Sequence, residues 1–328
     1  MKKCCFIIPY FGKLPNYFQL FLNSCKYNTD FNWLIFTDTR DDYQYPQNVQ
    51  MIQMSFEKMK EMANRKLGEK VALLRPYKLC DLKPMYGVIF EEYIKDFKCW
   101  GYCDVDTIMG NLSLFITDEM LNQYDKLFAL GHMTIYKNTA TNNRVFMCLH
   151  NGREVYKDII QSESNNWFDE EWKDDNNINQ IFLQQGKHVY ENDLSLNIDN
   201  LHNKFMQVKY VGKSKAPKTR GYVIDAKKDF LCTWECGHLI KYHKSGKKII
   251  KEEYPYIHLQ GRKMRLDKHI ENCLAYKIIP DEFLPLEFEK VSSENYCKIK
   301  KNGKCFHVQR MWIRKISRRW KKILNLWK

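Results

Sequence analysis

The chain has 328 residues, and 44% of them are apolar. It is long for one domain, short for two large ones, and apolar enough to bury a sizeable core. No apolar run approaches the roughly 20 residues of a membrane-spanning helix. The apolar residues 4–8 meet Pro9 and Gly12 too soon to form the centre of a signal peptide. We therefore expect a cytoplasmic protein.

The net charge of +14 is concentrated at the C-terminus. Residues 298–328 contain twelve Lys and Arg but no Asp or Glu, so the rest of the chain carries only +2. A nearly neutral body without a recognisable nucleic-acid-binding module argues against a nucleic-acid partner. The alternative is a nucleic-acid-binding protein that uses the basic tail. Because the basic residues are concentrated in this tail, the tail needs its own explanation.

The twelve cysteines are scattered from Cys4 to Cys305 and include no C-x-x-C pair. In a cytoplasmic protein, scattered cysteines are mostly small buried apolar residues. Zinc ligands or disulfides are the minor alternative.

The first part of the chain alternates strand and helix signals. Strands are expected at residues 4–8, 33–36, 49–54, 100–103 and 126–130. Helices are expected near residues 17–26, 56–66 and 84–96. This rhythm predicts an α/β fold with a mostly parallel sheet flanked by helices. Ligands of such sheets bind beyond the carboxyl ends of the strands, so polar residues at those ends are the first candidates for a site.

The later part of the chain changes character. Residues 151–200 are polar, acidic and tryptophan-bearing, which predicts loops and short helices. Residues 209–257 favour strands and hairpins, with tight turns at residues 235–238 and 244–247. We expect one globular unit, residues 1–290, followed by an extension, residues 291–328.

The strongest functional signal is the sequence WGYCDVD at residues 100–106. Asp104 and Asp106 follow an apolar strand, and side chains two apart on a strand share a face. Their oxygens suit Mg²⁺ or Mn²⁺, which usually also bind substrate phosphates. The alternative is an Asp-x-Asp that occurs by chance.

The second signal is the sequence YIHLQGRKM at residues 256–264. His258, at an expected strand end, can be a third metal ligand. Gly261 lets the backbone approach a ligand closely, and Arg262 and Lys263 could neutralise a diphosphate. The alternative is a hairpin end with ordinary surface charges.

Together these segments resemble the GT-A-fold glycosyltransferases, which carry an aspartate-x-aspartate motif. More narrowly, the chain is similar to a bacterial family linked to capsular polysaccharide and lipopolysaccharide synthesis. The resemblance covers roughly residues 4–265, through segments 7–12, 36–38, 77–84, 100–112, 131–132 with Asn138, 168–170, 233–235 and 258–264. The His258 segment also resembles one in retaining galactosyl- and glucosyltransferases, but here the spacing is shorter and no Pro-Trp follows Lys263.

The resemblance implies a GT-A-like (Rossmann-like) catalytic domain. Its activity would be metal-dependent transfer of a hexose from a nucleotide diphosphate sugar, a UDP-sugar, to a saccharide or lipid-linked saccharide acceptor. Asp104, Asp106 and His258 would bind Mn²⁺ or Mg²⁺, and Gly131, His132 and Asn138 would shape the sugar pocket. The residues implied at the nucleotide-sugar site are Pro9, Tyr10, Thr37, Asp38, Lys78, Asp81, Lys83, Asp104, Val105, Gly261 and Lys263. Ordinary helix-surface charge is the alternative for Lys78 and Lys83.

Asp169 and Glu170 are the candidates for the carboxylate that activates the acceptor. An inverting transferase needs a general base to deprotonate the acceptor hydroxyl. Glu171, Asp174 and Asp175 lie in the same acidic stretch, which could equally be a solvated face, and whether the reaction inverts or retains stays open. A metal-dependent nucleotidyl or phosphoryl transferase is the alternative enzyme, although the chain has no Gly-rich phosphate loop.

The tail predicts a basic amphipathic helix over residues 308–328. Apolar residues recur on one helical face at Val308, Trp312, Ile316, Trp320, Ile323 and Trp327. The basic residues Arg310, Arg314, Arg318, Lys321 and Lys328 fall mostly elsewhere. Such a helix is typical of one that lies on an anionic membrane surface, which predicts a peripheral protein on the inner face of the cell membrane. The alternative is a helix packed on the body or on a partner.

Overall fold

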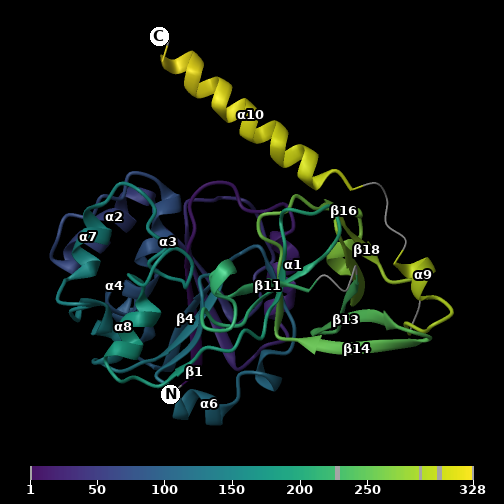
Figure 1. The fold of residues 1–328 in the computed structure, drawn as a ribbon, viewed down its shortest axis with the longest axis horizontal. Coiled ribbons are helices and arrows are strands. Elements are labelled where there is room, and N and C mark those ends of the chain that lie inside the picture. The colour runs from purple at the N-terminus through teal and green to yellow at the C-terminus, as the bar shows by residue number, and fades with distance from the viewer. Residues whose placement is uncertain (1, 226–229, 288–289, 301–304, 327–328) are drawn as a thin grey trace.

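The computed structural model describes residues 2–225, 230–287, 290–300 and 305–326 (Figure 1). Its largest described sheet follows the order β3-β2-β1-β4-β7-β6-β8. Its strands are β1 (Lys2–Pro9), β2 (Phe31–Thr37), β3 (Val49–Gln53), β4 (Phe97–Cys103), β6 (Lys126–Leu130), β7 (Met133–Lys137) and β8 (Val189–Tyr190). The expected strands are all present, so the α/β class is confirmed.

The expectation of a mostly parallel sheet is wrong, because this sheet is mixed. Strands β1 to β4 are parallel, but β7 runs antiparallel to both β4 and β6. Only Gly131 and His132 separate β6 from β7, and so short a connection can join only antiparallel strands. The strand order reverses between β1 and β4, which makes the carboxyl ends of these two strands the switch point of the sheet.

Two smaller described sheets are built largely from antiparallel pairs. One has the order β11-β10-β9-β15-β5 and the other β14-β13-β12-β17-β18-β16. The strands of the first are β5 (Thr107–Met109), β9 (Leu196–Ile198), β10 (Gln207–Tyr210), β11 (Tyr222–Ile224) and β15 (Tyr256–His258). Those of the second are β12 (Leu231–Glu235), β13 (His238–Ser245), β14 (Lys248–Tyr254), β16 (Arg265–Leu266), β17 (Ala275–Ile279) and β18 (Glu282–Pro285). The expected hairpin turns are confirmed, with Cys236 and Gly237 at φ 48° and 89° between β12 and β13.

The large sheet is buried on both faces, which explains why residues 4–8 form an unbroken apolar run. Cys5 and Ile7 face one apolar cluster and Cys4, Phe6 and Ile8 face the other. Helix α1 (Phe18–Cys25) belongs to the second cluster, and the helices of the first are α2 (Phe56–Leu67), α3 (Leu79–Leu82), α4 (Tyr86–Ile89), α5 (Glu91–Ile94), α7 (Val155–Gln161) and α8 (Ile178–Gln184). All twelve cysteines are free thiols, and six of them are buried.

The helix expected at residues 84–96 is broken into shorter pieces. Proline 84 has no backbone N–H, and the chain passes through a 3₁₀ turn, Lys83–Met85, before α4 and α5. A further 3₁₀ turn, Pro76–Lys78, precedes α3. This succession of short turns brings Lys83 to the carboxyl end of β4, with its ammonium group 2.9 Å from Asp104.

Helix α10 (His307–Leu326) confirms that a helix forms in the tail, and it rises away from the body (Figure 1). Its first turn docks: His307 Nε2 lies 3.1 Å from the carbonyl of Asn200, and Arg310 pairs with Asp281. Farther along, Trp312, Ile313 and Ile316 are 56%, 65% and 53% exposed. Of the tail residues named above, Trp327 and Lys328 lie outside the described residues, and so do the side chains of Arg314, Arg318, Trp320, Lys321 and Ile323.

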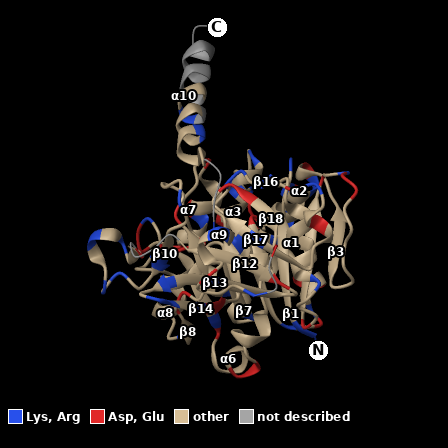
Figure 2. Cartoon of the chain, turned by 90° about the vertical axis from the view of Figure 1, so that its right-hand side faces the viewer, with Lys and Arg blue, Asp and Glu red and all other residues tan. Residues whose placement is uncertain are grey.

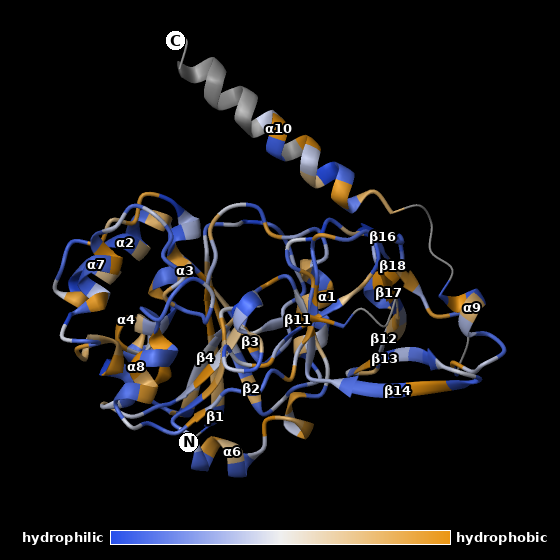
Figure 3. Ribbon diagram, in the orientation of Figure 1, coloured by the Kyte–Doolittle hydropathy of each residue, from blue (hydrophilic) through white to orange (hydrophobic). Residues whose placement is uncertain are grey.

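Charge and apolar surface both occur on the described part of α10. Basic residues lie on it and acidic ones do not (Figure 2), and apolar residues alternate with polar ones along it (Figure 3). Within the described chain, no helix has the length and apolarity required to cross a membrane.

The remaining described helices are α6 (Asp118–Gln123) and α9 (Tyr296–Ile299). The boundary between the globular unit and the extension at residue 290 stays a prediction.

Gly101 on β4 sets how closely β4 and β7 approach. A Cβ atom built at this position would lie 2.3 Å from the carbonyl oxygen of Thr134, which is backbone and cannot rotate away. We expect Gly101→Ala to lower the free energy of unfolding by about 2 kcal/mol or more, through overpacking. Urea denaturation would measure it, with Gly152→Ala as the control.

Gly152 has a φ of 78° but no neighbour within 4 Å, so its substitution tests backbone strain alone, at about 1 kcal/mol. A loss at Gly101 no larger than the loss at Gly152 would contradict the steric account.

Candidate metal centre

Asp104 and Asp106 lie in the short turn between β4 and β5. The Asp104 N–H donates to the carbonyl of His132 at 3.0 Å, and Thr107 Oγ1 donates to the carbonyl of Asp104 at 2.7 Å. These bonds fix the backbone of the turn on both sides of the two carboxylates. The pair therefore lies at the switch point of the large sheet, where such folds bind ligands.

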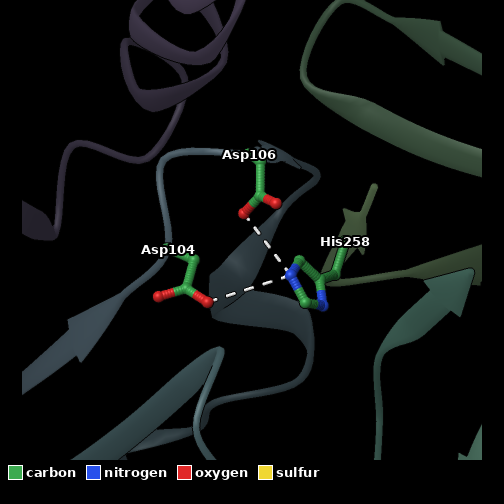
Figure 4. A group of neighbouring side chains, drawn as sticks. All are labelled: Asp104, Asp106 and His258. Carbon is green, nitrogen blue, oxygen red and sulfur yellow. Dashed lines mark ion pairs between the residues drawn. The ribbon is translucent and has the colours of Figure 1, made fainter. Parts of the chain in front are cut away.

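His258 is brought to these acids by strand pairing. It is the last residue of β15 and lies opposite Thr107 of β5, and the Leu259 N–H donates to the Asp106 carbonyl at 2.9 Å. Its Nε2 lies 3.4 Å from Asp106 Oδ1 and 3.8 Å from Asp104 Oδ2 (Figure 4). The prediction that His258 lies beside the acid pair is confirmed.

A hydrogen bond to Asn197 orients the imidazole of His258. Nδ1 of His258 lies 3.0 Å from Oδ1 of Asn197, which also accepts a hydrogen bond from Gln260 at 2.9 Å. Because an amide oxygen only accepts, Nδ1 carries the hydrogen and Nε2 is left free to face the acids. Asn197 is not among the expected site residues, because its only signal in the sequence is a polar residue between two apolar ones in a short strand.

The three side chains fit a divalent metal ion. Each side chain offers one ligand atom, and these three atoms all lie within 4.8 Å of one another. Two carboxylates and an imidazole suit Mn²⁺ or Mg²⁺, and so incomplete a set of protein ligands leaves positions for phosphate oxygens or water. The Gly261 N–H donates to the other oxygen of Asp106 at 2.5 Å and holds this carboxylate in place.

A cavity of about 1050 Å³ adjoins the centre. Its walls come from the turn after β1, the segment 76–86, the acid pair, the segment 165–170 and residues 261–264. The expected site residues on its walls are Pro9, Tyr10, Asp81, Lys83, Asp104, Val105, Asp106, Asp169, Glu170, Gly261 and Lys263. Segments from most of the chain's length thus meet at one cavity.

Lys83 links the metal centre to the acidic segment 168–170. Its ammonium group donates to Asp104 at 2.9 Å and to the carbonyl of Gly131 at 2.7 Å, and lies 3.3 Å from Asp169. Burial would lower the pKa of Lys83, but Asp104 and Asp169 raise it well above its ordinary value. The side chain therefore stays charged at neutral pH.

Asp169 and Glu170 also lie close to Lys83, with Asp169 3.3 Å from its ammonium group. Burial, opposed by Lys83 and reinforced by Glu170, raises the pKa of Asp169 to about 7. Burial also raises the pKa of Glu170. A Cβ atom at Gly131 would lie 2.7 Å from Asp169 and 3.1 Å from Glu170, so this glycine leaves the space that both carboxylates occupy.

A family model covers most of this architecture. The model, described as a family of unknown function (DUF6625), matches residues 6–287. The chain belongs to this family. The matched segment contains every residue of the metal centre and of the cavity walls named above, and it ends before α10. A search of curated proteins finds no match.

Three expected site residues of this family member are not on the walls of the cavity. Thr37 is fully buried in β2, and Asp38 accepts a hydrogen bond from the Gly12 N–H at 2.9 Å, which fixes the turn that carries Tyr10. The ammonium group of Lys78 is fully buried, 2.8 Å from Asp81. None of the three lines the cavity, so their contribution here is to position the residues that do.

Two residues expected in the sugar pocket have structural partners. His132 packs its ring against His258, with centroids 4.5 Å apart, and its Nδ1 lies 2.9 Å from the Tyr256 hydroxyl. The side-chain amide of Asn138 donates to the carbonyls of Ile94 and Phe97. His132 thus supports a candidate metal ligand from behind, and Asn138 fixes the start of β4.

The charge state of the centre predicts how metal binding depends on pH. Burial would lower the pKa of His258, but Asp106 and Asp104 raise it above its ordinary value. Burial would raise the pKa of Asp106, but His258 and the Gly261 N–H lower it. The empty site therefore favours a carboxylate beside an imidazolium, and a metal ion must displace the imidazolium proton.

We expect the affinity for Mn²⁺ to rise with pH until His258 is deprotonated. Below the pKa of His258, which exceeds about 6.5, the affinity should fall roughly tenfold per pH unit. Titration calorimetry between pH 5.5 and 8.5 measures it. His258→Asn should bind more weakly and lose this slope, whereas a wild-type affinity that stays flat across the range would exclude His258 as a ligand.

Proposed function

We propose that this protein is a metal-dependent glycosyltransferase with a GT-A-like fold. It transfers a sugar from a nucleotide diphosphate sugar, with UDP-sugars as the first candidates, to a saccharide acceptor. The proposal is carried by one observation: Asp104, Asp106 and His258 converge at the switch point of the sheet, beside a cavity of about 1050 Å³. A cavity of that size has room for a nucleotide sugar and part of an acceptor.

The residues of the centre have separate tasks in this reaction. A divalent ion held by Asp104, Asp106 and His258 would stabilise the negative charge that develops on the leaving nucleoside diphosphate. Lys263, on the same wall, adds positive charge near the phosphates. Pro9, at the end of β1, and Tyr10, in the turn that follows, line the cavity and would contact the nucleoside.

Lys83 separates the leaving-group side of the cavity from the acceptor side. Its contacts with Asp104 and Asp169 keep a positive charge between the two carboxylates. Asp169, with its raised pKa, is the better candidate for the general base, because a base works best when its pKa is near the working pH.

We expect Asp104→Asn and Asp106→Asn to lower the hydrolysis of the preferred UDP-sugar at least about a hundredfold, because both remove a charged ligand. The assay is a screen of nucleotide sugars with Mn²⁺, with nucleoside triphosphates included to test the nucleotidyl transferase alternative. EDTA should abolish turnover and Mn²⁺ should restore it.

Asp41 is an exposed acid outside the cavity walls, so Asp41→Asn is the matched control and should keep wild-type turnover. Full turnover in EDTA would exclude the metal role. Pyrophosphate release from nucleoside triphosphates, with no nucleotide sugar cleaved, would replace the transferase with the alternative.

We expect Asp169→Asn to lower turnover about a hundredfold or more with a smaller change in donor KM, because a base acts mainly in the transition state. The wild-type rate should rise with pH as Asp169 ionises. A bound metal ion attracts the carboxylate charge and lowers its pKa, so the midpoint lies at or below about pH 7.

The Asp169→Asn variant should lose this acidic limb of the pH profile, and Glu170→Gln should keep it. If both variants retain near-normal turnover, the base lies elsewhere or the reaction proceeds with retention.

We also propose that α10 holds the enzyme on an anionic membrane surface. The exposed Trp312, Ile313 and Ile316 provide apolar side chains for the headgroup region, and a tail with basic but no acidic residues favours anionic lipid. Each basic residue near such a surface contributes about 1 kcal/mol. A lipid-linked saccharide would then be an acceptor held in the same membrane.

Truncation after Met311 keeps the docked first turn of α10 and removes the rest. We expect this variant to lose binding to vesicles that contain phosphatidylglycerol, while wild-type binding weakens with salt and is absent from phosphatidylcholine vesicles. Co-sedimentation measures binding, and donor hydrolysis in solution should persist. Equal vesicle binding by the truncated and full-length chains would show that α10 is not the anchor.

A further inference from the structure

Two large aromatic side chains remain exposed at the cavity. Tyr77 is 71% exposed and Trp167 is 39% exposed, and both line the cavity walls. They come from the two segments that also carry Asp81 and Asp169. A large aromatic ring left in water beside a polar site is informative, because buried aromatic side chains far outnumber exposed ones among the described residues.

The backbone of Trp167 is held in a conformation that a bulky residue rarely adopts. Its φ is +55°, in the left-handed region. The Asp81 carboxylate accepts hydrogen bonds from the N–H of Asn166 at 2.9 Å and of Phe168 at 3.3 Å, on both sides of Trp167. Phe168 is fully buried in the core. These two hydrogen bonds thus keep Phe168 in the core while Trp167 stays at the cavity. Backbone strain such as the positive φ of Trp167 concentrates at functional sites.

The same framework joins the segment that bears Tyr77. The side-chain amide of Asn165 donates to the Tyr77 carbonyl at 3.2 Å and accepts from Arg75 at 3.0 Å. The buried ammonium group of Lys78 donates to the carbonyl of Ser164 at 2.7 Å. Tyr77 and Trp167, 90 positions apart, are therefore carried by one hydrogen-bonded unit whose buried ion pair is Lys78 and Asp81.

We propose that Tyr77 and Trp167 form the subsite for the acceptor sugar. The C–H groups on one face of a pyranose ring form an apolar surface that packs on an aromatic ring, while its hydroxyls stay free for hydrogen bonds. Trp167 precedes Asp169 by two residues, and Asp169 contacts Lys83, which also contacts Asp104 of the metal centre. A sugar on these rings would present a hydroxyl to Asp169, the candidate base. This assignment deepens the proposed function and rests on it.

The first experiment measures sugar binding without requiring turnover. Saturation-transfer NMR uses the methyl β-glycosides of glucose, galactose, mannose and N-acetylglucosamine as probes of the full-length protein. We expect transfer to at least one probe, a loss of at least fivefold in Trp167→Ala, and retention in Trp167→Phe. Trp172, 43% exposed in the same acidic stretch but outside the cavity walls, gives the matched control Trp172→Ala.

Trp167→Gly separates binding from folding. Glycine adopts a φ of +55° without strain, so this variant should unfold at the same temperature as the wild type or higher, while binding of the probe is lost. A lower unfolding temperature together with unchanged binding would assign Trp167 a purely structural role and overturn the subsite. So would wild-type binding of none of the four probes, or equal losses in Trp172→Ala and Trp167→Ala.

Kinetics distinguish failure of the subsite from failure of the proposed function. With a nucleotide sugar that the wild type hydrolyses, Trp167→Ala should raise the KM for the glycoside acceptor at least tenfold and the donor KM much less. An equal rise in both would place Trp167 at the donor and overturn the assignment. If no nucleotide sugar is hydrolysed but Trp167→Ala alone loses glycoside binding, the sugar subsite stands and the transferase proposal fails.

Discussion

Charge balance in the cavity depends on the ammonium group of Lys83. Two groups of carboxylates converge there, because Lys83 contacts both Asp104 and Asp169. Like charges this close in a poorly solvated site cannot all ionise without a compensating cation. Asp169 already shows the consequence, because burial and Glu170 raise its pKa to about 7 even with Lys83 in contact. The broken helix that begins at Pro84 is what brings this lysine to the end of β4.

This balance also explains why a metal ion and a base can share one cavity. A cation held by Asp104, Asp106 and His258 would balance the negative charge of these acids and of the phosphates on the proposed leaving group. Lys83 then shields Asp169 from that group of acids. The proposed reaction needs this separation, because its leaving group gains negative charge while its base must first carry one and then accept a proton.

How much of the fold and of the candidate site could be predicted depends on the length of the apolar pattern that each strand leaves in the sequence. Strands β1, β2 and β4 were predictable because strands buried on both faces read as unbroken apolar runs, and the acid pair follows one of them. Strands β5 and β15 have three residues each and carry no readable periodicity, yet their pairing delivers His258 to the acids. The resemblance to a known family pointed to that meeting, together with the place of His258 at the end of an apolar run.

Other features were hidden because the contacts that decide them are not local. The two-residue turn before β7 makes the sheet mixed, although the residues on either side read as ordinary apolar runs. Lys78 illustrates the same limit: its ammonium group satisfies the carbonyls of Ile159 and Ser164, more than 80 positions away, rather than a ligand. A lysine near a motif can thus act on the site through the backbone it holds, a role that no sequence spacing reveals.

The root of α10 and the wall of the cavity belong to one bonded framework. Arg262, next to Gly261, is buried and donates to the carbonyls of Asp199 and Pro280. The residues that follow these carbonyls, Asn200 and Asp281, are the ones that dock the first turn of α10. The chain enters β1 at the bottom of Figure 1 and α10 rises from the top, so the carboxyl end of β1, at the cavity, faces the side of α10. A membrane bound by α10 would therefore have a fixed relation to the cavity, and an acceptor held in that membrane would approach from the same side.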